Sequence, residues 1–181
     1  MSPLEDTYLA FIGPGAMAEA MISGLLREEL VAPEAIIASG PHERRGREIT
    51  GRYGVAHTTV NAQAAREAHV VVLAVKPQTL SHVLAELRGQ IRPDALVLSI
   101  VAGARVDTIA EGLGHRKIVR VMPNTPARMG EGMSVWMCTP EVEPHQRDQA
   151  QAILGALGKE LLVDHEGYLD MATALSGTGP A

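Results

Sequence analysis

The stretch Phe11-Ile12-Gly13-Pro14-Gly15-Ala16-Met17-Ala18 decides the fold, because it joins an apolar run to a segment of helical period. It follows the pattern G-x-G-x-x-G/A, in which the first glycine permits a tight turn and the second lets the backbone approach a diphosphate. The last small residue allows helix and strand to pack closely, and the helix N-terminus offers its N–H groups to the phosphates. The stretch predicts a dinucleotide-binding turn, with a plain tight turn as the alternative. The expected cofactor contacts are Gly13, Pro14, Gly15, Ala16, Met17 and Ala18.

The rest of the chain alternates between apolar runs and segments of helical period. Short runs rich in Val, Ile and Leu predict strands buried on both faces, at residues 8–12, 36–39, 70–74, 96–100, 117–122, 133–137 and 160–163. Between most of them, apolar residues recur three or four apart, as in Met17, Met21 and Leu25. This order predicts an α/β fold of the Rossmann-like, doubly wound type, a mostly parallel sheet with helices on both faces.

A change in composition near residues 164–167 divides the chain. We expect a dinucleotide-binding domain over 1–164, then a linker and the start of a helical domain over 165–181. The chain ends one residue after Gly179-Pro180, and proline at a first helical position usually begins a helix. We therefore expect the natural protein to continue beyond Ala181.

Composition excludes several function classes. The 181 residues carry 16 Lys and Arg against 21 Asp and Glu, a net charge of −5, which argues against nucleic-acid binding. The single cysteine, Cys138, excludes an intramolecular disulfide and a cysteine-based zinc cluster. The seven histidines are scattered without ligand spacing, so we expect no metal site. The apolar runs are too short to span a bilayer, and we expect a soluble, cytoplasmic protein.

The end of the second predicted strand indicates which dinucleotide is bound. An acidic residue there would bind the ribose of NAD, but Ser39 occupies the place, followed by Arg44 and Arg45. A hydroxyl and arginines suit a 2′-phosphate, which Arg grips through two hydrogen bonds. We expect NADP(H) to be preferred, with NAD(H) as the second choice. The alternative is that Arg44, Arg45 and Arg47 form a solvated helix face.

Three further motifs carry a family resemblance. They are Leu73-Ala74-Val75-Lys76-Pro77-Gln78, Arg120-Val121-Met122-Pro123-Asn124-Thr125-Pro126-Ala127 and Thr173-Ala174-Leu175-Ser176-Gly177-Thr178-Gly179-Pro180-Ala181. Together with the glycine-rich turn, in this order and spacing, they resemble the Δ1-pyrroline-5-carboxylate reductases over essentially the whole chain. The family continues with an all-helical domain that dimerises and completes the substrate site. The resemblance therefore implies a homo-oligomer and further residues that are not in this sequence.

The resemblance also implies roles for individual residues. Ser39 and Pro41 would lie near the adenosine ribose, and Asn61 would contact the cofactor. The loop beside the nicotinamide ribose would contain Ala74, Val75, Lys76 and Pro77, and Ala102 would lie near the nicotinamide. The substrate positions would be Glu166 and Pro180, with Thr178 standing where serine is commoner in the family.

Local sequence adds candidates for the substrate site. Pro123 and Pro126 exclude a helix and predict a stiff loop, in which the Asn124 amide suits a binding site or a structural turn. A helix start at Thr178, Gly179 and Pro180 would present N–H groups to a substrate carboxylate.

The expected reaction is reduction of L-1-pyrroline-5-carboxylate to L-proline by hydride transfer from NAD(P)H. A protonated imine is already electrophilic, so positioning and exclusion of water dominate, and no acid–base pair is assigned. Glu166 is a candidate to hold the ring nitrogen. Two alternatives stay open: another NADP-dependent oxidoreductase of the β-hydroxyacid dehydrogenase type, and a non-catalytic NADPH-binding sensor module.

Overall fold

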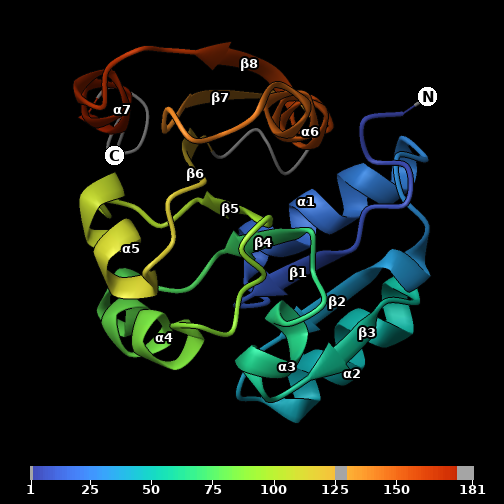
Figure 1. Ribbon diagram of the computed structural model, residues 1–181. Coiled ribbons are helices and arrows are strands. Elements are labelled where there is room, and N and C mark those ends of the chain that lie inside the picture. The colour runs from blue at the N-terminus through green and yellow to red at the C-terminus, as the bar shows by residue number, and fades with distance from the viewer. Residues whose placement is uncertain (1, 125–129, 175–181) are drawn as a thin grey trace.

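The computed structural model describes residues 2–124 and 130–174, which form an α/β fold around one sheet (Figure 1). The sheet contains eight strands in the order β3-β2-β1-β4-β5-β6-β7-β8. The strands are β1 (Leu9–Ile12), β2 (Ile36–Ser39), β3 (Ala56–Thr58), β4 (Val70–Leu73), β5 (Leu96–Ser99), β6 (Ile118–Pro123), β7 (Gly132–Cys138) and β8 (Gly158–Leu162).

All the helices but the last lie in the connections between strands. The α-helices are α1 (Ala16–Arg27), α2 (Glu43–Tyr53), α3 (Asn61–Ala65), α4 (Leu80–Leu87), α5 (Val106–Leu113), α6 (Pro144–Gly155) and α7 (Gly167–Ala172). Two 3₁₀ turns, η1 (Pro33–Ala35) and η2 (Pro77–Thr79), precede β2 and α4.

The sheet register brings the predicted site positions to one edge. β1 pairs in parallel with β2 and β4, so that Ile12 lies beside Ser39 and Leu73. β4 pairs in parallel with β5, which places Leu73 beside Ser99. Because the carboxyl ends of parallel strands meet at the same edge, the segments that follow β1, β2, β4 and β5 lie together there.

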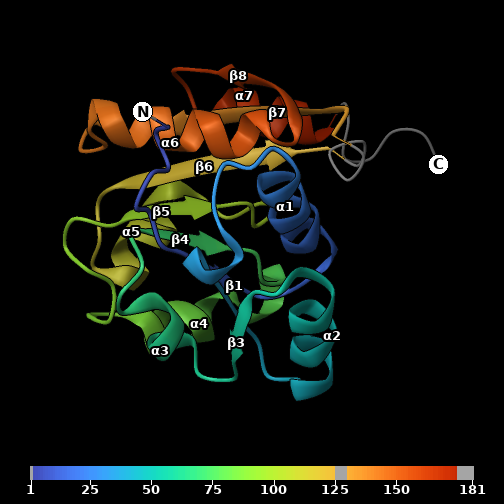
Figure 2. The ribbon, with the colours of Figure 1, turned by 90° about the vertical axis from the view of Figure 1, so that its right-hand side faces the viewer.

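Helices cover both faces of the sheet, and each face has its own apolar core. One core joins buried residues of β1 to α1 and α6, among them Phe11, Met21 and Ile153. The other packs residues such as Val71, Leu84 and Ile109 from β4, α4 and α5. Figures 1 and 2 show the two layers of helices with the strands between them. This arrangement confirms the predicted doubly wound, mostly parallel fold.

The structure differs from the sequence-based expectation in two strands. The edge strand β3 was not expected, since Ala56-His57-Thr58 is short and lacks an apolar run. Pro123, assigned to a loop, is instead the last residue of β6 and pairs with Ser134 of β7. That pairing is antiparallel, so β7 and β8 run against the other six strands.

The helix α7 follows β8 and packs against β6 and β7. A domain boundary near residue 164 therefore stays a prediction. In the part of the chain that the structure describes, no helix combines the length and apolar character needed to cross a membrane.

Candidate functional site

The glycine-rich turn has a backbone conformation that requires glycine at its first position. Gly13 has a φ of +96° and donates its N–H to the Ser39 carbonyl at 2.8 Å. A Cβ at this position would lie 2.8 Å from the Ala74 carbonyl oxygen and 2.9 Å from Cγ1 of Val75. Gly13 thus lies between the last residue of β2 and the segment that follows β4.

The second glycine of the turn faces open space. Gly15 is the N-cap of α1, is exposed, and would place a Cβ more than 4 Å from any other group. No side chain caps α1, so the N–H groups of its first turn are presented to whatever approaches Gly15. Ala18 is fully buried, as close helix–sheet packing requires. These features fit a diphosphate at the helix N-terminus.

Ser39 and Asn61, both predicted cofactor residues, are brought together. The Ser39 hydroxyl donates to the Asn61 side-chain oxygen at 2.7 Å, and the Asn61 amide donates to Glu86 at 2.8 Å. The next residue, Gly40, packs against Pro14, since a Cβ at Gly40 would lie 2.4 Å from the proline ring. Pro41 is exposed beside them. The segment after β2 therefore contacts the glycine-rich turn directly.

The arginines at the start of α2 differ in what they contact. The Arg44 side chain is 89% exposed, with Nε 3.8 Å from Glu48. Arg47 pairs with Glu43 at 3.1 Å, one helical turn away on the surface. A solvated helix face therefore describes both Arg44 and Arg47, and the predicted phosphate contact of Arg44 stays a prediction.

Arg45 turns back onto the glycine-rich turn. Its Nε donates to the Pro14 carbonyl at 2.9 Å, and one terminal nitrogen pairs with Glu19 in the first turn of α1. Burial alone would raise the pKa of the Glu19 carboxyl, but hydrogen bonds from Arg45 and Tyr53 and the charges of Arg45 and Arg52 lower the pKa below its usual value. Glu19 was not expected at the site, and Arg45 was expected only to serve phosphate binding or to lie in solvent.

The remaining predicted cofactor positions follow β4 and β5. Ala74 donates its N–H to the Ile12 carbonyl at 2.8 Å, and Val75 contacts Gly13, as described. Lys76 and Pro77 are exposed at the start of η2, and Ala102 is exposed after β5. The structure places these positions on the same edge as the glycine-rich turn.

The predicted substrate positions are only partly described. Asn124 accepts a hydrogen bond from the Met133 N–H at 2.9 Å, so its amide ties the end of β6 to β7. Thr178, Gly179 and Pro180 lie outside the described residues. The substrate role of these four residues stays a prediction.

Glu166 has several partners inside the protein. Its carboxylate accepts hydrogen bonds from the Val106 N–H at 2.8 Å and from Arg120 at 2.6 Å, and it pairs with Arg105 at 3.4 Å. Arg120 is buried in β6 and reaches Asp170 of α7 at 2.9 Å with its other terminal nitrogen. Glu166 thus joins α7 to α5 and to the sheet; its role toward substrate stays a prediction.

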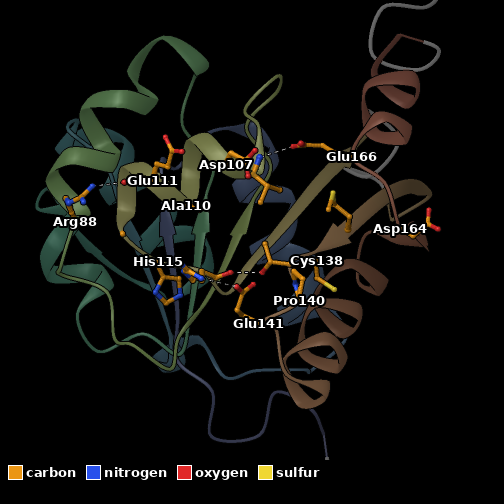
Figure 3. A pocket seen from close by; sticks show the side chains of 15 residues that line it. Arg88, Asp107, Ala110, Glu111, His115, Cys138, Pro140, Glu141, Asp164 and Glu166 are labelled. Carbon is orange, nitrogen blue, oxygen red and sulfur yellow. Dashed lines mark hydrogen bonds and ion pairs between the residues drawn. The ribbon is translucent and has the colours of Figure 1, made fainter.

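Glu166 also lines a cleft of about 850 Å³ beside α5. Figure 3 shows Glu166 reaching the N-terminus of α5 near Asp107. Cys138 and Pro140 line the wall of the cleft across from α5. The cofactor positions described above do not line this cleft. Among the described residues, no group of three His, Cys, Asp or Glu side chains is placed to hold a metal ion.

Comparison with known proteins agrees with this geometry. Residues 8–103 match the family model described as NADP oxidoreductase, coenzyme F420-dependent. The chain is 43% identical to a pyrroline-5-carboxylate reductase of Synechocystis over 96% of its length and 64% of that protein.

Solved structures give the same result. A pyrroline-5-carboxylate reductase from Coxiella burnetii superposes with a TM-score of 0.91 at 33% identity, covering 96% of this chain and 65% of that one. The Plasmodium falciparum pyrroline carboxylate reductase, solved with NADP bound, gives a TM-score of 0.85 at 28% identity, covering 97% and 64%.

This chain therefore spans slightly less than two thirds of the relatives' length. The matched region contains the glycine-rich turn and the strand ends around it. The chain belongs to the family described as NADP oxidoreductase, coenzyme F420-dependent, and its resemblance to the pyrroline-5-carboxylate reductases is confirmed.

Proposed function

We propose that the protein of which this chain forms the dinucleotide-binding part reduces L-1-pyrroline-5-carboxylate to L-proline, with NADP(H) preferred over NAD(H). The observation that carries the proposal is the uncapped N-terminus of α1 at Gly15, which opens onto free space at the carboxyl edge of the sheet. The similarity to pyrroline-5-carboxylate reductases supports the substrate.

The residues of this chain would bind and orient the reactants. The first turn of α1 would hold the diphosphate, and Ser39 and Pro41 would lie beside the adenosine ribose. Asn61 would orient Ser39 through the hydrogen bond between their side chains. When bound, the reduced nicotinamide supplies the hydride. Lys76, Pro77 and Ala102 would border the nicotinamide, and Asn124 would lie beside the substrate.

The test first measures the intact mass of the natural gene product. It then follows the loss of NADPH absorbance when that protein is mixed with pyrroline-5-carboxylate. A β-hydroxyacid with NADP⁺ is the parallel substrate. We expect turnover of the imine only. Turnover of the hydroxyacid would favour the dehydrogenase alternative, and tight NADPH binding without turnover of either would favour the sensor. For residues 1–181 alone we expect NADPH binding with poor turnover, because the relatives are longer.

Replacing Arg44 with Gln is expected to weaken NADPH binding by about 10- to 100-fold, which corresponds to the loss of one charge-assisted contact with the 2′-phosphate. NADH binding is expected to change little, because NADH lacks that phosphate. The measurement is the dissociation constant of each dinucleotide by nicotinamide fluorescence. The matched control is Arg47→Gln, which removes an exposed arginine of the same helix. Equal losses for both dinucleotides in Arg44→Gln would contradict the assignment.

We further propose a cytoplasmic homo-oligomer, with residues 165–181 leading into a helical domain that dimerises and completes the substrate site at Glu166, Thr178, Gly179 and Pro180. The resemblance to the family supports this arrangement. Light scattering of the natural gene product tests the oligomer, and a monomer would reject it.

A further inference from the structure

We propose that Arg45 is a positioning residue that fixes the dinucleotide-binding turn in its binding conformation, and that Glu19 holds Arg45 in place. The inference rests on the proposed dinucleotide site and assigns Arg45 a role distinct from that of Arg44. It concerns the diphosphate, which NADPH and NADH share, and not the 2′-phosphate that separates them.

The Arg45 guanidinium is bound on several sides by groups of the protein. Its Nε donates to the Pro14 carbonyl at 2.9 Å. One terminal nitrogen pairs with Glu19, and the other lies 3.5 Å from Glu48. All three nitrogens of the guanidinium are therefore engaged within the protein. The side chain is 29% exposed, against 89% for its neighbour Arg44. Three contacts to three different groups hold the plane of the guanidinium against the glycine-rich turn.

The direction of the Pro14 carbonyl also sets the orientation of the peptide that leads into α1. The peptide that contains this carbonyl also contains the N–H of Gly15, the N-cap of α1. Because the peptide is planar, fixing the carbonyl direction fixes the plane of that N–H as well. The Gly15 N–H donates to the Gly13 carbonyl at 2.8 Å, which closes the turn. Arg45 thus restrains the Pro14–Gly15 peptide, one of the two peptides between Gly13 and Gly15.

Arg45 is itself held by Glu19. Glu19 lies in the first turn of α1. Its carboxylate forms ion pairs with Arg45 and Arg52 and accepts a hydrogen bond from the Tyr53 hydroxyl at 2.9 Å. The hydrogen bond with Glu19 raises the pKa of the Arg45 guanidinium. The cluster links α2 to the start of α1. A turn held in its binding conformation before the ligand arrives loses less conformational entropy on binding.

The test uses Arg45→Met, which keeps an unbranched apolar stem and removes every donor. We expect the dissociation constants of NADPH and NADH to rise by the same factor, about tenfold. The binding of ADP-ribose, which contains the diphosphate, should weaken equally, whereas adenosine 2′-monophosphate, which lacks it, should bind as before. Arg45→Lys should recover part of the affinity, because lysine keeps the pairing with Glu19 but cannot also reach Pro14. Arg47→Met is the matched control and should change nothing.

Three results would overturn the inference. Loss of NADPH binding with intact NADH binding would make Arg45 a 2′-phosphate ligand. Weaker binding of adenosine 2′-monophosphate together with a lower melting temperature would indicate a merely structural role. Unchanged affinities would exclude any role in the site. If the unaltered chain binds neither NADPH nor NADH, the proposed function itself fails. Weaker binding in a variant alone concerns only the role of Arg45.

Discussion

Replacing Gly13 with alanine is expected to destabilise the protein by about 2–5 kcal/mol and to abolish measurable dinucleotide binding. Two effects combine. The backbone at Gly13 has a φ of +96°, which L-residues rarely adopt, and the new Cβ would lie 2.8 Å from the Ala74 carbonyl oxygen. That oxygen belongs to the backbone at the end of β4 and cannot move aside as a side chain would. The turn must therefore shift, which displaces the N-terminus of α1.

Gly15 provides the comparison that separates folding from binding. Its φ is −80° and a Cβ there meets no other group within 4 Å, so Gly15→Ala should leave the free energy of unfolding nearly unchanged. The added methyl group would occupy the space that we propose for the diphosphate, so we expect NADPH binding to weaken by about tenfold or more. Gly51→Ala, in the exposed interior of α2, is the control and should stabilise slightly. Urea unfolding and nicotinamide fluorescence measure the two quantities. Tight NADPH binding by Gly13→Ala would refute this description of the turn.

Replacing Glu166 with alanine is expected to cost about 2–4 kcal/mol of stability, because it leaves the buried guanidinium of Arg120 with fewer partners. The Arg120 side chain is 4% exposed, so its charge depends on partners within the protein. Asp170 stays in contact with Arg120 but is half exposed and satisfies a single nitrogen. The same change also removes the acceptor for the Val106 N–H at the start of α5.

The control for this prediction is another ion pair at the same cleft. Arg116 and Glu141 are 3.7 Å apart and largely exposed, so Glu141→Ala should change the free energy of unfolding by less than about 0.5 kcal/mol. A double variant, Arg120→Met with Glu166→Leu, should recover much of the loss, since it leaves no buried charge. Urea unfolding measures all of them. Equal stability of Glu166→Ala and Glu141→Ala would show that the buried charge finds other partners. Unchanged kcat/KM in Glu166→Ala of the natural gene product would separately discard the predicted contact between Glu166 and the substrate ring nitrogen.

The sequence by itself determined the order of the main strands and the position of the dinucleotide turn. Both depend on local chemistry: runs such as Val70–Leu73 are apolar throughout because helices cover both faces, and Gly13 and Gly15 stand where strand gives way to helix. The strand β3 escaped prediction because an edge strand of three residues needs no apolar run. Pro123 escaped because proline is tolerated where a strand ends.

Only the tertiary structure decided what the charged side chains do. Arg44, Arg45 and Arg47 are indistinguishable in the sequence, yet Arg45 binds the glycine-rich turn, whereas Arg44 and Arg47 are exposed and pair with glutamates of their own helix. Glu166 and Arg120 are 46 residues apart and meet because α7 packs back on the sheet. Apolar periodicity fixes which face of an element is buried, but the partner of a charge depends on how elements distant in sequence are packed. Long, flexible side chains reach such partners only after the sheet and its helices have been assembled.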